Sequence, residues 1–426
     1  MKFKKMVSVI LGGLLSISMI GCSSTSGGNG EENKQAEGKT TIKFINGFTG
    51  GDGAYMRRIT DAFNESQDKY FLEELQEKEH YTKFKSDDYD LVVMHGNNLP
   101  TYQKDGLLRE MDDIYEKAEI SIDDFHKVGK NLVTIDDKKY GIPLDIHPLT
   151  MFYNKELVKE TPKNYSDLVR INKELQAKDK NLYATGIPGT GLVEFLMITI
   201  AAQNDVNLVD GDYLKFNTNE FADALMIYHD MIWKDKISPS GLGLDGEFQA
   251  FMKESQDNSS VQTGVALTGP WYYGAVKNKY GDNLGIGSVP AIGKKEAVSG
   301  NSHLISVSSK VTDQDKLDAI SEFFKFLYTP ENLLNWAESG QAPVHIETMK
   351  KIEENKDKYE LAYYNQQQFD SFIQAPAVYQ FGEQMRYMNE NVFQLLVSTE
   401  NLTKDQLMSE LTMATEMAKQ VADMQP

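Results

Sequence analysis

The sequence contains a single cysteine, Cys22, among its 426 residues. One cysteine cannot form an intramolecular disulfide, so the folded chain depends on burial and hydrogen bonding for its stability. Basic residues are also scarce, because 44 Lys and Arg face 63 Asp and Glu and the formal net charge is −19. This acidic balance argues against nucleic acid as a partner, since neutralising phosphates requires clustered Lys and Arg.

Long hydrophobic runs are lacking except at the N-terminus. Three lysines precede an apolar run over residues 6–20, which is shorter than the ~20 residues of a membrane-spanning helix. This pattern predicts an export signal over residues 1–21. The residues Met19-Ile20-Gly21-Cys22 resemble the lipobox of bacterial lipoproteins, and the resemblance implies lipidation of Cys22. An ordinary secretory signal cleaved nearby is the alternative.

Residues 22–39 have almost no apolar side chains. Such a segment cannot offset the entropy cost of its own ordering, and it predicts a flexible tether. Removal of the signal takes away three lysines and changes the formal charge from −19 to −22. A lipidated cysteine on this tether would hold a folded domain outside the cytoplasm at the cell membrane, as on a Gram-positive cell surface.

Residues 40–426 are numerous enough for two or three domains of about 150 residues each. Apolar alternation at Ile42 and Phe44 predicts a strand, and a glycine-rich loop follows it. The pattern over residues 54–66 predicts a helix, and the apolar run at residues 91–94 predicts a buried strand. This order is typical of an open α/β sheet, whose ligands bind beyond the carboxyl ends of the strands. No low-complexity linker divides the chain, which favours lobes joined by more than one crossing.

Enzyme motifs are not supported. Residues 241–246 fit GxGxxG, but no apolar strand precedes them, and His345 lacks the second histidine of a zinc-binding helix. Paired acids such as Asp88 and Asp90 are most simply solvated surface groups, although glycoside hydrolysis needs only two carboxylates. The sequence therefore predicts no enzyme, no metal ligands and no cofactor, with an exported glycosidase or peptidase left as an alternative.

Aromatic residues lie at several predicted turn edges, among them Trp271, Tyr272 and Tyr379. A flat ring can cover the C–H face of a sugar while neighbouring amides and carboxylates bind its hydroxyls. Core packing is the alternative for each ring taken singly. Trp271 follows Gly-Pro, a turn that would direct the indole away from its own helix, and it is the strongest candidate for ligand contact.

Seven segments occur together in an order and spacing that resemble one family. They are FTGGDGAYMRRITDAFNES, DLVVMHGNNLPTYQKDGLLREMDD, YGIPLDIHPLTMFYNKELV, TPKNYSDL, GVALTGPWYYG, VPAIG and FLYTPENLLNWAESGQAPV. On these segments the chain resembles an extracellular solute-binding protein (family 1) of a sugar ABC importer, and it is distantly similar to maltodextrin-binding proteins.

The resemblance implies an α/β, two-lobe periplasmic-binding-protein-like (type II) fold with multiple crossings between the lobes. Lobe 1 is expected to comprise residues 40–145 plus about 302–342, and lobe 2 about 146–301 plus 343–426. A mono- or oligosaccharide would be clamped between them by a population shift, because only the closed form contacts it from both sides. A membrane permease, another chain, would then recognise the closed form.

The resemblance also implies the ligand-binding residues. They are Thr49, Asp52, Asn97, Asn98, Asp145, His147, Trp271, Tyr272, Asn301, His303 and Tyr379. Asn97 and Asn98 stand where maltodextrin binders have a charged pair, which implies a different ligand preference. Residues 76–88 look contracted relative to the family, which places any ligand contact from that segment in doubt.

The expected partners are a small sugar, the permease and the membrane through the lipid anchor, and the expected state is a monomer. Two other solute classes stay open, because similar lobes bind polyamines and metals. A polyamine would need carboxylates along an aromatic slot, and an iron site could use paired tyrosines such as Tyr272-Tyr273 or Tyr363-Tyr364.

Overall fold

The computed structural model describes residues 37–253 and 261–426. The predicted signal, the lipidation site Cys22 and most of the predicted tether lie outside these residues. Residues Gly38–Pro426 form one compact unit. Within residues 37–253 and 261–426, every helix is too short or too polar to cross a membrane.

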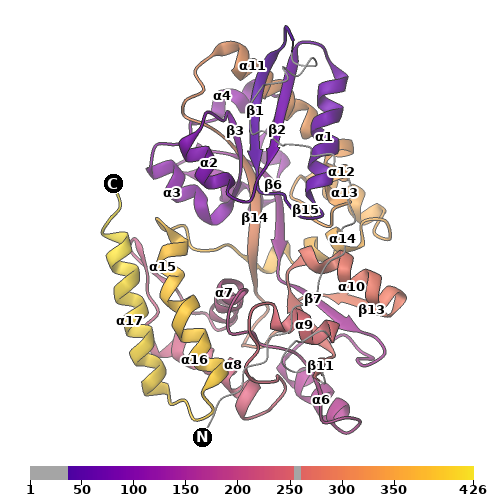
Figure 1. Ribbon diagram of the computed structural model, residues 1–426, viewed down its shortest axis with the longest axis vertical. Helices are drawn as coiled ribbons and strands as arrows, with labels where there is room; N and C mark the ends of the chain where they lie inside the picture. Colours follow the sequence, from indigo (N-terminus) through magenta and orange to yellow (C-terminus); the bar gives the residue numbers. More distant parts are fainter. Residues whose placement is uncertain (1–36, 254–260) are drawn as a thin grey trace, which may run out of the picture. The chain divides into compact units, whose positions relative to one another are not determined.

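A mixed sheet of seven strands is the largest in the described part of the chain (Figure 1). Its strand order is β15-β6-β14-β3-β1-β2, and β16 pairs with β14. The strands are β1 (Thr40–Asn46), β2 (Tyr70–Gln76), β3 (Leu91–His95), β6 (Ile142–Pro148), β14 (Val298–Val307), β15 (Ala342–Pro343) and β16 (Phe372–Ile373). Strand β1 is parallel to β2 and β3, whereas β14 is antiparallel to β3 and β6.

The predicted strands at the N-terminal end of the domain are confirmed. Ile42, Phe44 and Ile45 of β1 are buried, and so is the apolar run Leu91–Met94 of β3. The predicted first helix is α1, where Met56, Ile59 and Phe63 form the buried side. Asp52 occupies the N-cap position but makes no side-chain capping bond, so its carboxylate is not committed to the helix.

The sheet and its helices enclose one hydrophobic cluster, which we call cluster 1. It runs from Ile42 to Ile146 and from Leu304 to Phe372. The helices of this part are α1 (Gly53–Ser66), α2 (His80–Ser86), α3 (Leu99–Lys104), α4 (Asp112–Lys117), α5 (Lys127–Val133), α11 (Gln314–Leu327), α12 (Pro330–Ala337), α13 (Ile346–Glu354) and α14 (Glu360–Gln366). The short pair β4 (Thr134–Ile135) and β5 (Lys138–Lys139) also lies here.

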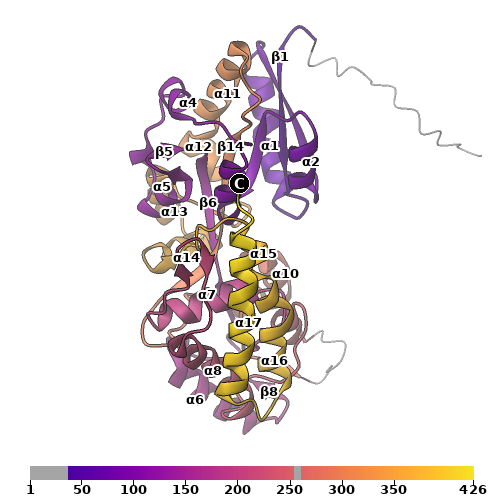
Figure 2. The same ribbon diagram turned by 90° about the vertical axis from the view of Figure 1, so that its left-hand side faces the viewer.

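A second cluster, cluster 2, runs from Leu149 to Val298 and from Ala375 to Ala418. Its sheet has the order β12-β7-β13, formed by β7 (Thr150–Asn154), β12 (Val265–Thr268) and β13 (Leu284–Gly287). Its helices are α6 (Tyr165–Gln176), α7 (Val193–Gln203), α8 (Asn219–Trp233), α15 (Phe381–Tyr387), α16 (Phe393–Ser398) and α17 (Lys404–Ala422). Helices α9 (Gly246–Met252) and α10 (Tyr273–Tyr280) pack in a smaller third cluster against the same sheet. Figure 2 shows the C-terminal helices α15, α16 and α17 side by side.

Short strand pairs complete this part of the chain. They are β8 (Leu182–Tyr183) with β11 (Gln262–Thr263) and β9 (Val209–Asp210) with β10 (Tyr213–Leu214). The second pair is antiparallel and encloses a turn at Gly211-Asp212. The GxGxxG-like residues 241–246 precede α9, as a loop that leads into a helix.

The chain passes between the two clusters at three places within the described residues: after Ile146, before Leu304 and after Phe372. This arrangement is an α/β fold of two lobes with several crossings. The boundaries stay a prediction. Residues from 343 onward were expected in lobe 2; of these, Val344, Ile352 and Phe372 pack in cluster 1, whereas Leu361 packs with Phe152 and Val276 of the second part. Strand β15 pairs with β6, and this pairing keeps the following segment beside the first sheet.

Glu247 of α9 is a carboxyl in an apolar position. Its side chain is 0% exposed, Oε1 accepts a hydrogen bond from Thr268 Oγ1 at 2.9 Å, and Oε2 has no partner among the described residues. Burial raises the pKa of Glu247 to about 7, because a low-dielectric environment disfavours the charged carboxylate.

We expect Glu247 to make stability depend on pH near neutrality. Its folded-state pKa exceeds the unfolded value of about 4.3, so the folded chain takes up the proton first and gains stability as the pH falls through 7. Between pH 8 and pH 6 this contribution is about 1.4 kcal/mol. Urea unfolding at pH 8 and at pH 6 measures this contribution. The gain in the free energy of unfolding from pH 8 to pH 6 should be smaller by about 1.4 kcal/mol in Glu247→Gln than in the wild type. The exposed control Glu400→Gln should respond as the wild type does, and identical responses of wild type and E247Q would contradict the assignment.

Candidate functional site

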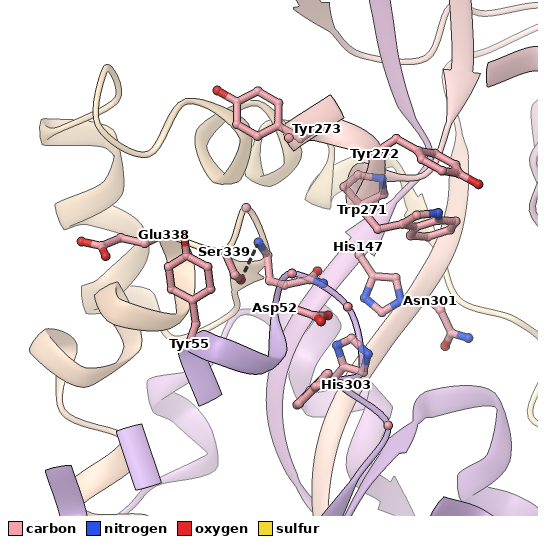
Figure 3. Close-up of a pocket in the computed structure, with 18 of the residues that line it drawn as sticks. Asp52, Tyr55, His147, Trp271, Tyr272, Tyr273, Asn301, His303, Glu338 and Ser339 are labelled. Carbon is pink, nitrogen blue, oxygen red and sulfur yellow. Dashed lines mark hydrogen bonds between the residues drawn. The ribbon is translucent and has the colours of Figure 1, made fainter. Parts of the chain in front are cut away.

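A pocket of about 740 Å³ lies where strands β1 and β3 end at their carboxyl termini. This is the position expected for a ligand in an open α/β sheet, and the volume suits a small organic ligand. Its lining comes from both sides of the fold (Figure 3). The lining residues of the first lobe include Phe48, Asp52, Tyr55, His80, His95 and Glu338, and those of the second include Phe195, Trp271, Tyr272, Tyr273 and Lys277.

Six of the predicted ligand residues line this pocket. They are Asp52, His147, Trp271, Tyr272, Asn301 and His303. The structure thus brings together residues from positions 52 to 303 that are remote in the sequence, as the resemblance implied. Their contact with a ligand stays a prediction.

The other five predicted residues do not line the pocket: Thr49, Asn97, Asn98, Asp145 and Tyr379. Thr49 is exposed between two lining residues. Asn97 donates to Glu194 Oε1 of α7 at 3.1 Å, and the hydroxyl of Tyr379, 6% exposed, donates to Asp105 Oδ1 at 3.0 Å. Side chains engaged in this way have less hydrogen-bonding capacity left for a solute.

Asn97 instead joins the two lobes. It lies in the short helix η1 (Gly96–Asn98), which follows β3, and its partner Glu194 belongs to the first turn of α7. Burial raises the pKa of Glu194 to about 7, and the hydrogen bond from Asn97 lowers it in part. The Asn97 amide therefore bonds to the other lobe. The resemblance had implied that it contacts sugar hydroxyls instead.

Trp271 presents an open ring to the pocket. Its side chain is 49% exposed, and it lies in the 3-10 turn η3 (Pro270–Tyr272) between β12 and α10. Gly269 precedes this turn, and a Cβ there would approach the indole to 2.2 Å, so only glycine leaves room for the ring. The neighbouring Tyr272 stacks on Phe248 with ring centroids 3.9 Å apart, which fixes the turn that carries Trp271.

Polar residues meet on three adjacent strands at the base of the pocket. Asp145 of β6 lies opposite His303 of β14, and His303 lies opposite His95 of β3. Side chains directly opposite across a sheet share one face, and residues two apart on a strand do also. His147 therefore joins the same row from β6, beside Asp145.

Asp145 holds two of these histidines. It is 0% exposed and accepts hydrogen bonds from His147 Nδ1 at 3.1 Å and from His303 Nδ1 at 3.0 Å. Trp336 Nε1 donates to Oδ2 of the same carboxylate at 2.8 Å, the oxygen that also accepts from His303. The predicted ligand residue Asp145 thus orients pocket residues and lies beneath the pocket surface.

The electrostatics of this row follow from burial and from the carboxylate. Burial alone would raise the pKa of Asp145, but the charges and hydrogen bonds of His303 and His147 hold it below its ordinary value. Burial lowers the pKa of His147, against the raising effect of Asp145. Burial and the neighbouring His303 and His147 lower the pKa of His95. The pKa shifts of His95 and His147 therefore both favour the neutral ring.

Two histidines that line the pocket, His95 and His80, were not predicted from the sequence. His95 ends the buried strand β3, and a polar residue at the carboxyl end of such a strand is a usable signal. His80 begins α2, inside the segment 76–88 that looked contracted. That segment retains a helix of seven residues, and the helix brings His80 to the pocket.

A two-lobe α/β chain with a pocket between its lobes is the architecture of a solute-binding protein. Residues 47–375 match the bacterial extracellular solute-binding protein family, and the chain belongs to this family. The family is one of proteins that bind solutes outside the cytoplasm.

Relatives by sequence are sugar-binding proteins. The maltooligosaccharide ABC transporter solute-binding lipoprotein of Streptococcus pneumoniae serotype 4 is 24% identical over 302 residues, which cover 63% of this chain and 66% of that protein, just under two thirds of its length. The galactooligosaccharide-binding protein of Bacillus subtilis is 25% identical over 214 residues, 48% of each chain.

Solved structures share the fold. The sugar-binding protein MalE from Xanthomonas citri matches with a TM-score of 0.74 at 18% identity, over 89% of this chain and 98% of that one. The GacH receptor of Streptomyces glaucescens, which was solved unliganded and with acarbose, matches with a TM-score of 0.73 at 17% identity, over 91% and 100%. These likenesses confirm the predicted two-lobe type II fold.

Proposed function

We propose that the chain is the receptor of a carbohydrate ABC importer and that it binds a mono- or oligosaccharide and releases it unaltered to a membrane permease. The observation that carries the proposal is the half-exposed indole of Trp271 in a pocket that also holds Asp52 and Asn301. A ring stacks on the apolar face of a sugar, and carboxylate and amide groups bind its hydroxyls. The sugar-binding relatives support the same solute class.

The predicted lipid anchor fits this role. Lipidation of Cys22 and the tether of residues 22–39 would hold the receptor outside the cytoplasm next to its permease, where tethering raises the effective concentration of the two partners. One of the relatives is itself named a lipoprotein. A monomer suits this role, since each receptor closes around its own solute.

Isothermal titration with maltotriose and with a galactooligosaccharide tests the proposal directly. A ligand at 100 times its Kd adds about 2.7 kcal/mol to stability, so a thermal-shift panel can first select the sugar. X-ray scattering should show compaction on binding, and chromatography should recover the sugar intact. Binding of spermidine or ferric ion in place of every sugar, or consumption of the sugar, would refute the proposal.

A further inference from the structure

Three histidines converge at the base of the pocket. His95, His147 and His303 each offer a ring nitrogen, and these three atoms lie within 4.8 Å of one another. All three side chains line the pocket, and Figure 3 shows the rings of His147 and His303 next to each other. The ring centroid of His303 lies 4.4 Å from that of His147 and 5.0 Å from that of His95.

The surrounding residues fix how these rings are turned. An ionised carboxylate only accepts hydrogen bonds, so His147 and His303 must carry their protons on Nδ1, toward Asp145. The Nδ1 of His95 bonds to the hydroxyl of Tyr81 at 2.8 Å. Hydrogen bonds at Nδ1 leave the Nε2 atom of each ring without a hydrogen-bonding partner among the described residues.

A carboxylate behind a histidine is the usual support of a metal-bound imidazole. It fixes the tautomer and raises the basicity of the nitrogen that binds the ion. Here one carboxylate, Asp145, supports two histidines, and Trp336 in turn holds the carboxylate at 2.8 Å. The strand register of β6, β14 and β3 sets the positions of all four groups.

An anion site is a poorer explanation of the same cluster. Binding an anion would need protonated rings, and three imidazolium ions beside a single carboxylate and a monovalent anion would still leave one buried positive charge unbalanced. Neutral imidazoles are the common ligands of Zn²⁺, Ni²⁺, Co²⁺ and Cu²⁺. With bonds of 2.0–2.1 Å the nitrogens of a tetrahedral Zn²⁺ site lie about 3.4 Å apart, and the atoms that the three rings offer already lie within 4.8 Å of one another.

We propose that His95, His147 and His303 bind one divalent transition-metal ion of the Zn²⁺ class, with its remaining coordination position open to the pocket. Three protein ligands and an open position are typical of sites where the ion contacts a small molecule. The sequence predicted no metal ligands, because the three histidines lie on segments that only the folded sheet brings together. This inference goes beyond the carbohydrate-receptor proposal and does not depend on it.

Titration of the metal-stripped mature protein with ZnCl₂, in the absence of any sugar, tests the site. We expect one equivalent to bind, the unfolding temperature to rise, and EDTA to reverse the change. Co²⁺ should give the intense visible absorption of a four-coordinate ion, and azide should change this spectrum by occupying the open position. No saturable binding, or a stoichiometry above one, would overturn the proposal.

Variants assign the ligands. His95→Ala should weaken Zn²⁺ binding by at least about 100-fold, since even loss of a supporting residue costs 10- to 100-fold. His95→Gln serves as a second variant if H95A does not fold, because a glutamine can still bond to Tyr81. The matched control His345→Ala lies outside the pocket, where its Nδ1 bonds to Thr348 at 3.0 Å, and it should bind as the wild type does. Equal affinity of H95A and wild type would overturn the assignment, whatever the outcome with sugars.

Discussion

Replacing Trp271 with alanine should weaken carbohydrate binding by about 1.5–3 kcal/mol, roughly 10- to 150-fold in Kd. The indole is 49% exposed in the free protein, and a sugar stacked on it would bury this apolar area. The variant also removes the edge contacts of Trp271 with His147 and Phe195, whose ring centroids lie 6.5 and 6.4 Å away. These contacts are few, so the folded state should lose little stability.

Titration calorimetry with the sugar selected by thermal shift measures this effect. Trp271→Phe retains a smaller ring and should lie between alanine and the wild type, whereas Tyr213→Ala, on β10 outside the pocket, should bind normally. Circular dichroism and the unfolding midpoint control for folding. A W271A protein that folds and binds sugar with unchanged affinity would exclude this ring from the site.

The local elements of the fold could be predicted because their signals are local. Apolar alternation marked β1, the run Leu91–Met94 marked β3, and helical spacing marked α1. The position of Val344–Phe372 could not be predicted in this way. It depends on the pairing of the two-residue strand β15 with β6, a contact between segments almost 200 residues apart that leaves no periodic pattern.

The pocket was predicted in part for a similar reason. Trp271 could be found because a Gly-Pro turn precedes it, and glycine is required where a Cβ would meet the indole. The resemblance implied Asp145 and His303, but their alignment with His95 in one row could not be predicted, because a shift of one residue in strand register would turn these side chains to the opposite face. Asn97 was assigned to the ligand because its helix η1 follows a strand, but its amide bonds to Glu194 of the other lobe.

Asp145→Asn should produce the largest loss of stability of the substitutions considered, about 3–5 kcal/mol. The carboxylate is fully buried and accepts hydrogen bonds from His147, His303 and Trp336. An asparagine has one acceptor oxygen, and its NH₂ group would face a donor and leave buried polar atoms unpaired. The loss of charge also removes the favourable interaction with the two histidines.

Urea unfolding in buffer with EDTA isolates this effect from any bound metal ion. Asp370→Asn is the matched control, because Asp370 is exposed and pairs with Lys127 at 2.9 Å, and an exposed pair contributes at most about 1 kcal/mol. If D145N unfolds at the same urea concentration as D370N, the carboxylate does not hold the strands β6 and β14 together. The histidine rings would then owe their orientation to packing against Phe48, which contacts His303 edge-on at 4.9 Å, and Asp145 would lose its positioning role.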